Sequence, residues 1–371
     1  MFTLLPLRNA LTKPTFGLTA RFMSYNANMS KNTTENRVRY DMRSDTVTKP
    51  TQNMFTHMLT TANVGDDVYG EDISINNLEK RMAQMTGKEA GVFCTSGTLS
   101  NQLGFRSHLT QPPYSVLCDI NAHVHVYEAS GIAFHSRAST NTVKPKNDKY
   151  ITLDEVKEYY VPDDEDVHCA PTRIFSLENT INGVIHDFAK ENSIVMHLDG
   201  ARLWNASAKT GIPLSEYGKY FDSMSICFSK GMGAPVGSIL LGTTKLIKKA
   251  RHFRKLFGGG WRQAGFLAEA ANYTIDNHFQ LLKDDHRRAE KLHDEFAKLG
   301  MTFAHPVETN MVFANFGSVG INVFELAEAL EKNGILIMPY SDSVARLVFH
   351  HQIDDNAAEE ILSIVKGMIK A

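Results

Sequence analysis

The chain has 371 residues, of which 43% are hydrophobic and 22% are charged, and its formal net charge is −2. This composition is that of a globular protein and gives no reason to expect nucleic acid or an anionic membrane as a partner. No apolar run is long enough to span a bilayer, and the four scattered cysteines form no CxxC pair, which favours a reducing compartment over a disulfide framework or a structural zinc site.

The N-terminal stretch is basic and is not expected to belong to the fold. Four basic residues and no acid precede Glu35, namely Arg8, Lys13, Arg21 and Lys31. Leucine, phenylalanine and hydroxyl residues lie between them, which is typical of a mitochondrial presequence. We therefore predict a targeting leader over residues 1–38, with a possible processing site near Met23. A disordered tail without targeting function is the alternative.

After the leader, short apolar runs alternate with stretches that have helical periodicity. The runs at 91–95, 115–119, 173–177, 194–198, 223–228 and 238–242 predict buried strands, and 75–86, 98–109 and 153–160 predict helices. Short apolar strands separated by helices indicate a mostly parallel sheet with helices on both faces. Length alone also favours two domains.

From about residue 283 the pattern changes to that of a smaller α+β domain. A long charged helix is expected at 283–299, followed by strands at 311–316, 335–338 and 344–349, a helix at 323–333 and a last helix. We predict a large domain over 39–282 and a small one over 283–371. The segment 39–70 is expected to pack across both.

The connection between the strands at 173–177 and 194–198 is unusually short. Only 187–192 has a helical pattern, which gives at most two turns, whereas a parallel crossover usually needs a dozen or more residues. We expect either a cramped crossover or one that lacks residues present in relatives. A missing helix would expose apolar sheet surface.

Lys230 is the most informative single residue. A short apolar run delivers it into a stretch of small residues, SICFSKGMGAPVG at 225–237. An amine in partly apolar, glycine-lined surroundings loses solvation and becomes a nucleophile, which can form a Schiff base with an aldehyde such as pyridoxal phosphate. A lone lysine at a strand end would more often be a surface residue, but two other strand ends carry suitable partners.

Those partners are a phosphate cradle and an acid. Ser96, Gly97 and Thr98 follow one strand and open a helix, where free N–H groups and a hydroxyl can bind phosphate. Asp199 ends another strand and could hold a pyridine nitrogen protonated, and Arg202 could bind the cofactor or a carboxylate in bidentate fashion. Each could instead be an ordinary helix cap. Neither a G-x-G-x-x-G motif nor a P-loop is found in the expected position.

Taken together, these motifs resemble the threonine aldolase family of fold-type-I pyridoxal-phosphate enzymes, and most closely its fungal members. The resemblance runs from about Tyr40 to the C-terminus. It rests on MRSDTVT at 42–48, VGDDVYGED at 64–72, SGTLSNQ at 96–102, HLDGAR at 197–202, the Lys230 stretch and GGGWRQ at 258–263. The combination is highly specific, although no single motif is.

The resemblance implies a role for each matching residue. Lys230 would hold pyridoxal 5'-phosphate covalently, Asp199 would pair with its ring nitrogen, Ser96, Gly97 and Thr98 would hold its phosphate, and His123 would stack on its ring. Ser44, Arg202 and Arg346 would bind the substrate carboxylate, and Arg262 would reach the phosphate from a neighbouring subunit, so a homodimer or homotetramer is implied. The implied reaction cleaves threonine or allo-threonine to glycine and acetaldehyde, and no metal is implied.

Two departures from the family pattern keep alternatives open. Family members often have histidine where Ile181 stands in ENTIN at 178–182, so the general base is unassigned, with His125, His123 or a water on the cofactor phosphate as candidates. The preference between threonine diastereomers is open too, although low specificity is favoured. Another fold-type-I lyase, an aminotransferase, or an inactive relative weakened by the short crossover are the competing interpretations.

Overall fold

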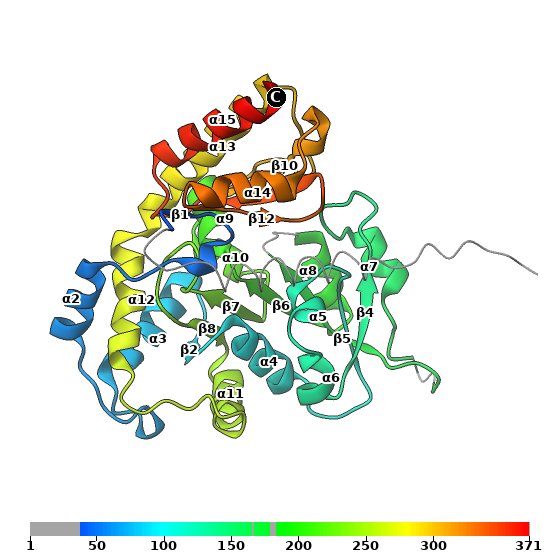
Figure 1. Cartoon of the computed structure of the whole chain (residues 1–371). Coiled ribbons are helices and arrows are strands. Elements are labelled where there is room, and N and C mark those ends of the chain that lie inside the picture. Colours follow the sequence, from blue (N-terminus) through cyan, green and yellow to red (C-terminus); the bar gives the residue numbers. More distant parts are fainter. Residues whose placement is uncertain (1–37, 165–166, 179–182, 371) are drawn as a thin grey trace, which may run out of the picture.

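The computed structural model describes residues 38–164, 167–178 and 183–370. A seven-stranded sheet with the order β2-β8-β7-β6-β5-β3-β4 forms its centre (Figure 1). The strands are β2 (Ala90–Cys94), β3 (Ser115–Asp119), β4 (Ser139–Val143), β5 (Thr172–Glu178), β6 (Val195–Gly200), β7 (Ser223–Cys227) and β8 (Ser238–Gly242). Only β8 runs antiparallel to its neighbours, so the carboxyl ends of the other six strands lie at one edge.

Six of these strands lie within two residues of their predicted positions, and β4 is the exception. Its sequence, STNTV, is polar, and β4 is an edge strand that pairs only with β3. An edge strand with little buried surface needs no apolar run, so hydrophobic pattern alone does not reveal it. The mostly parallel α/β fold is confirmed.

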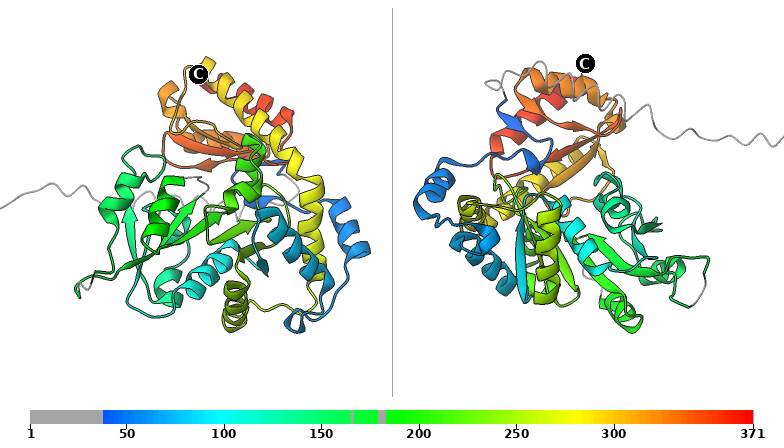
Figure 2. Two further views of the ribbon diagram at one scale, coloured as in Figure 1. Left: turned by 180° about the vertical axis from the view of Figure 1, so that it is seen from behind. Right: turned by 90° about the horizontal axis from the view of Figure 1, so that it is seen from below.

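Helices cover both faces of the sheet (Figure 2). One face packs against α4 (Gly97–His108), α5 (His123–Val126), α6 (Gly131–Ser136) and α11 (Thr244–Leu256). The other packs against α3 (Ile73–Thr86), α7 (Leu153–Tyr159), α8 (Gly183–Glu191), α9 (Leu203–Thr210), α10 (Leu214–Gly218) and α12 (Gly265–Asn277). Because side chains alternate along β6, Met196 and Leu198 point into the core between the sheet and α8, whereas His197 and Asp199 face α4.

The crossover between β5 and β6 is longer than predicted, and the limit of two turns was wrong. Helix α8 has nine residues and begins at Gly183, four residues before the predicted start. Ile185 and Ala189 are fully buried in the large core, so α8 covers this part of the sheet. Residues 179–182, which include Ile181, lie outside the described residues.

The C-terminal part forms a second core around a small antiparallel sheet with the order β12-β13-β10-β9. Its elements are α13 (Leu282–Lys298), β9 (Thr302–Phe303), β10 (Met311–Asn315), α14 (Val323–Lys332), β11 (Ile335–Leu336), β12 (Met338–Pro339), β13 (Val344–Val348) and α15 (Asp355–Lys370). The single strand predicted at 335–338 is two strands in different sheets. The two cores divide within α13, and the predicted domain boundary at 282 stays a prediction.

The segment 39–70 contacts both parts, as expected. Strand β1 (Tyr40–Asp41) pairs with β11 of the C-terminal part in a separate two-stranded sheet, and α2 (Gln52–Thr61) packs on α12 (Figure 1). Two short 3-10 helices, η2 (Asp45–Val47) and η3 (Asp67–Tyr69), lie before and after α2. Among the described helices, none has the length and apolarity that crossing a membrane requires.

Candidate active site

The carboxyl edge of the sheet gathers the predicted chemical groups. Asp199 ends β6, Lys230 follows β7 and His123 follows β3, while Glu178 ends β5 directly opposite Asp199 in the strand register. Lys230 is half-buried, and its Nζ makes no hydrogen bond or ion pair with the described residues. Burial raises the pKa values of Asp199 and Glu178, and the nearby charge of Lys230 partly opposes this rise at both carboxylates. A free amine next to buried acids is what an aldehyde cofactor requires.

Asp199 is 2% exposed and has two hydrogen-bond donors from the protein. Its Oδ2 accepts from Asn101 Nδ2 at 2.9 Å, and its Oδ1 accepts from the Ala201 amide at 3.1 Å. Burial raises the pKa of Asp199, and the Lys230 ammonium only partly opposes this effect. A protonated ring nitrogen next to this carboxyl group would restore its ionised form, so the residue fits the predicted role.

His123 is held by a buried carboxylate that the sequence analysis did not identify. Its Nδ1 donates to Glu128 Oε1 at 3.0 Å, and this hydrogen bond raises the pKa of His123. Glu128 is 3% exposed and also accepts from Asn101 at 2.9 Å and from Gln102 at 2.7 Å. Potential metal-ligand atoms of His123, Glu128 and Asp199 lie within 4.8 Å of one another. Hydrogen bonds from His123 to Glu128 and from Asn101 to both carboxylates already fix their positions.

Ser96, Gly97 and Thr98 form the first turn of α4. The Ser96 hydroxyl caps this helix by accepting from the Leu99 amide at 3.1 Å. The amides of Gly97 and Thr98 have no acceptor among the residues that the structure describes. A Cβ at Gly97 would come within 2.9 Å of Cys227 Sγ, so glycine lets the helix approach the strand that carries Lys230. Unpaired amides at a helix N-terminus fit a phosphate group.

Arg202 is anchored by Asp45, a second residue that the sequence analysis missed. Its Nε and one Nη donate to the two Asp45 oxygens at 2.9 and 2.7 Å. Asp45 is fully buried, and although burial alone would raise its pKa, the Arg202 guanidinium holds that pKa below its ordinary value. The bidentate pair fixes the guanidinium plane and leaves its remaining N–H groups free to bind a carboxylate.

Arg346 reaches the same region from β13 of the small sheet. It donates to the Arg43 carbonyl at 2.9 Å, and its buried Nε has no partner among the described residues. Desolvation and the nearby charge of Arg202 lower the pKa of Arg346, and the charge of Asp45 partly opposes this effect. Ser44 caps η2 and lies beside Asp45, with 3.5 Å between its Oγ and Oδ1. These groups fit an anionic substrate.

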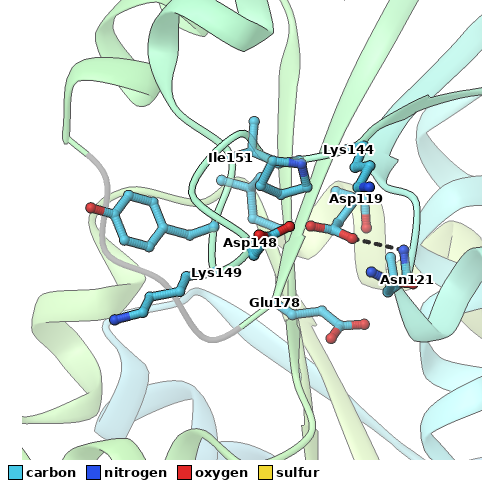
Figure 3. A pocket seen from close by; sticks show the side chains of 12 residues that line it. Asp119, Asn121, Lys144, Asp148, Lys149, Ile151 and Glu178 are labelled. Carbon is cyan, nitrogen blue, oxygen red and sulfur yellow. Dashed lines mark hydrogen bonds between the residues drawn. The ribbon is translucent and has the colours of Figure 1, made fainter. Parts of the chain in front are cut away.

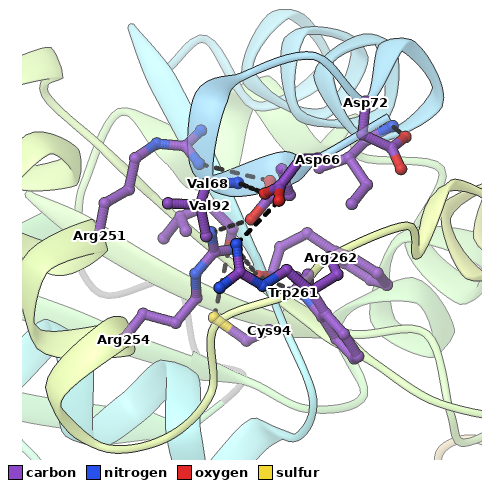
Figure 4. Close-up of polar contacts among 12 residues, drawn as sticks. Asp66, Val68, Asp72, Val92, Cys94, Arg251, Arg254, Trp261 and Arg262 are labelled. Atoms are coloured by element: carbon purple, nitrogen blue, oxygen red, sulfur yellow. Dashed lines mark hydrogen bonds and ion pairs between the residues drawn. The ribbon is translucent and has the colours of Figure 1, made fainter. Parts of the chain in front are cut away.

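Arg262 does not join this cluster within the chain. Its side chain is 57% exposed and pairs with Asp66 at 2.8 Å, in the polar cluster of Figure 4. Beneath it, the buried Arg254 donates to the Phe93 carbonyl at 2.7 Å and pairs with Asp67. Its recorded ion pair is with Asp66 and not with the groups at the carboxyl edge, and its predicted role in a neighbouring subunit stays a prediction.

His125, the other histidine considered as a general base, lies apart from these groups, and Glu178 is a further carboxylate that the sequence analysis did not single out. His125 is exposed on α5, and no contact of its ring with the other site residues is recorded among the described residues. Glu178 borders a pocket of about 240 Å³ that Asp119, Lys144, Asp148 and Lys149 also line (Figure 3). Desolvation and repulsion from Asp199 raise the pKa of Glu178 to about 7, and its Oε1 accepts from the His123 amide at 2.5 Å.

Comparisons with known proteins agree with this geometry. The family model for β-eliminating lyases matches residues 41–318. The chain is 46% identical to low-specificity L-threonine aldolases from Eremothecium gossypii and Saccharomyces cerevisiae, over 86% of its own length and 85% and 84% of theirs. A solved threonine aldolase from Leishmania major superposes with a TM-score of 0.76 at 18% identity, covering 89% of this chain and 99% of the other.

Proposed function

This chain belongs to the β-eliminating lyase family, and from that membership we propose that it is a low-specificity L-threonine aldolase. The protein is a carbon–carbon lyase that cleaves L-threonine and L-allo-threonine to glycine and acetaldehyde. The observation that carries the proposal is the meeting of Lys230, the buried Asp199 and the two arginines Arg202 and Arg346 at one edge of the sheet.

The cofactor in this proposal is pyridoxal 5'-phosphate, and the chain offers a group for each of its parts. Lys230 would bind its aldehyde, Asp199 would face its ring nitrogen, and the free amides of Gly97 and Thr98 would hold its phosphate. When bound, the cofactor supplies an electron sink for the electron pair that stays on the substrate α-carbon when its bond to the β-carbon breaks. The unpaired amides and the raised pKa of Asp199 support this assignment.

The arginines orient the substrate. Arg202, held in one plane by Asp45, and Arg346, with an unpartnered Nε, bind the substrate carboxylate, and Ser44 adds a hydroxyl. Fixing the carboxylate sets the direction of the bond between the α- and β-carbons, and such orientation can lower a barrier by several kcal/mol. Because threonine and allo-threonine share this carboxylate, the two arginines alone do not distinguish between them, which supports low specificity.

His123 is the proposed acceptor for the proton of the substrate β-hydroxyl. Its Nδ1 is committed to Glu128, so its Nε2 carries the free lone pair, and the same hydrogen bond makes the ring more basic. His123→Asn, which keeps a donor at the Nδ1 position, should therefore reduce turnover more than it reduces cofactor affinity. Equal losses in turnover and in cofactor affinity would contradict this role.

The direct test gives the purified, cofactor-loaded protein threonine and allo-threonine separately and follows acetaldehyde and glycine. Release of both products from both substrates is the expected result. Release of ammonia and a keto acid would instead indicate an eliminating lyase, and a keto acid formed with an amino-group acceptor would indicate an aminotransferase. A cofactor band that does not shift on adding glycine, with no product, would identify an inactive relative.

The active unit is proposed to be a homodimer or a homotetramer with shared active sites. Arg262 is exposed in the single chain, and Tyr69 and Leu256 are 76% and 74% exposed, which supports a covered interface in the assembly. Lys230→Ala and Arg262→Ala proteins, each inactive alone, should regain part of the activity when their subunits are exchanged. No recovery in verified hybrids would refute shared sites.

The protein is proposed to reside in mitochondria. The support is compositional, because residues 1–34 carry four bases and no acid, and this stretch lies outside the described residues. Fusion of residues 1–38 to a fluorescent protein should direct it to mitochondria. A fusion that stays diffuse would refute a targeting role and favour a simple N-terminal tail.

A further inference from the structure

A continuous chain of buried hydrogen bonds runs from α4 through β6 and β7 to the carboxylates of the site. His108 Nε2 and Ser223 Oγ are 2.9 Å apart, and Ser223 Oγ and His197 Nδ1 are 2.8 Å apart. His197 Nε2 then meets Asn101 Oδ1 at 3.1 Å. The Asn101 amide nitrogen reaches both Asp199 and Glu128, each at 2.9 Å.

The chemistry of the groups allows only one proton order along this chain. Carboxylates accept, so the Asn101 amide nitrogen must face Asp199 and Glu128, and its oxygen must face His197. His197 must therefore carry its proton on Nε2 and accept at Nδ1. Ser223 then donates to His197 and accepts from His108, so each member determines the orientation of the next.

Both histidines are kept uncharged by their surroundings. Burial lowers the pKa of His197 to about 3 and the pKa of His108 to about 4. His197 is fully buried between β7 and α4, with Phe105 tilted against it at a centroid distance of 4.9 Å. A Cβ at Gly104 would come within 2.8 Å of His197 Cε1, so α4 leaves room for this ring only because residue 104 is glycine.

We propose that Asn101 and His197 are positioning residues: His197 fixes the orientation of Asn101, and Asn101 holds Asp199 directly and His123 through Glu128. This inference rests on the function proposed above. Helix α4 then has two roles. Its first turn offers backbone amides to the phosphate, and Asn101 in its next turn orients Asp199, the acid for the ring nitrogen. A buried amide between two carboxylates can perform this task only while its orientation is fixed.

A matched pair of substitutions at His197 tests the inference. Counted in bonds from Cβ, the glutamine amide nitrogen corresponds to imidazole Nε2 and the asparagine amide nitrogen to Nδ1. His197→Gln should therefore keep the donor to Asn101, and His197→Asn should lose it. The readouts are the dissociation constant of pyridoxal 5'-phosphate and the pH dependence of the visible absorbance of the loaded protein.

Asn101→Leu removes the donor to both Asp199 and Glu128. The lost bond to Asp199 alone should raise that dissociation constant by about 10- to 100-fold. His197→Asn should raise it in the same direction, His197→Gln should stay within about twofold of the unmodified protein, and the double variant Asn101→Leu/His197→Asn should be no worse than Asn101→Leu. The pH at which the visible band changes should shift in Asn101→Leu and His197→Asn together.

A second comparison covers the case in which the His197 variants fail to fold. Ser223→Ala removes the donor to His197, whereas Ser107→Ala removes a buried hydroxyl on α4 that has no hydrogen-bond partner among the described residues. Only Ser223→Ala should shift the pH dependence of the band. Equal behaviour of the two serine variants, or of His197→Gln and His197→Asn, would overturn the inference. Failure of the unmodified protein to take up the cofactor would instead refute the proposed function.

Discussion

Asp45→Asn tests whether the anchor of Arg202 matters as much as the geometry indicates. The substitution keeps the volume of the side chain and one acceptor, but it removes the charge and one of the two acceptors that hold Arg202 at 2.9 and 2.7 Å. A hydrogen bond between charged groups contributes about 1.5–3 kcal/mol. The substitution removes the charge as well as one acceptor, so the loss exceeds that of a single bond, but the Arg202 side chain is 22% exposed and water offsets part of it. We therefore expect about 2–3 kcal/mol.

In kinetic terms this loss is large enough to measure directly. If it falls on the substrate complex, kcat/KM for threonine should drop by about 30- to 150-fold, since 1.36 kcal/mol corresponds to one decade. The affinity for pyridoxal 5'-phosphate should change less, because the Asp45 carboxylate hydrogen-bonds to Arg202 and Ser44 and acts on Lys230 only through its charge. The assay is acetaldehyde release at varied threonine concentration, with cofactor affinity measured in parallel.

The matched control is a surface ion pair. Asp163 and Arg173 are 2.6 Å apart, but their side chains are 63% and 39% exposed, so Asp163→Asn should leave kcat/KM unchanged. Two results would refute the reasoning for Asp45→Asn. One is an unchanged kcat/KM, and the other is a loss that lies entirely in cofactor affinity.

Three further outcomes are expected. Lys230→Ala should fold but lose the visible band that appears on cofactor addition, and a variant that keeps this band would exclude Lys230 as the attachment point. Burial lowers the pKa of His197 to about 3, against about 6.5 in an unfolded chain, so unfolding takes up a proton between these two values. The free energy of unfolding should therefore fall by about 1.4 kcal/mol per pH unit as the pH decreases from 6.5 toward 3. His197→Gln should reduce that slope in pH-dependent denaturation curves, and an unchanged slope would contradict the neutral buried ring. Gly104→Ala should cost about 1–3 kcal/mol in denaturant unfolding and weaken cofactor binding, whereas Gly367→Ala on α15, where a Cβ meets nothing within 4 Å, should be neutral or stabilising.

The elements that hydrophobic pattern predicts well are those that bury both faces. Strands β3 and β8 have the predicted bounds because each is an uninterrupted buried run between polar turns. Strand β4 was not predicted, because only one of its five residues, Val143, is buried. Helix α8 was predicted too short because its buried residue Ile185 lies before the charged stretch that carried the helical pattern.

Some site residues can be recognised from local sequence motifs, whereas others depend on partners that are distant in the sequence. The positions of Lys230, Asp199 and Gly97 at the carboxyl edge could be predicted because each lies at or just after a strand end in a recognisable motif. Asp45 lies within such a motif too, but its partner Arg202 is 157 positions away, and no local pattern reveals that pair. Glu128 has no motif at all, and its role depends on how α4 packs on the sheet.

The competing hypothesis of an inactive relative relied on the crossover, and the packing of α8 weakens its physical basis. Phe188 stacks on Phe175 with 6.3 Å between ring centroids, and Tyr160 meets Phe188 edge-on at 5.5 Å. These rings and the buried Ile185 cover the sheet face opposite α4. Strand β6 is thus held between α8 on one side and α4 on the other among the described residues. Because Asp199 ends this strand, a crossover of nine helical residues is enough to fix the carboxylate on which the proposed chemistry depends.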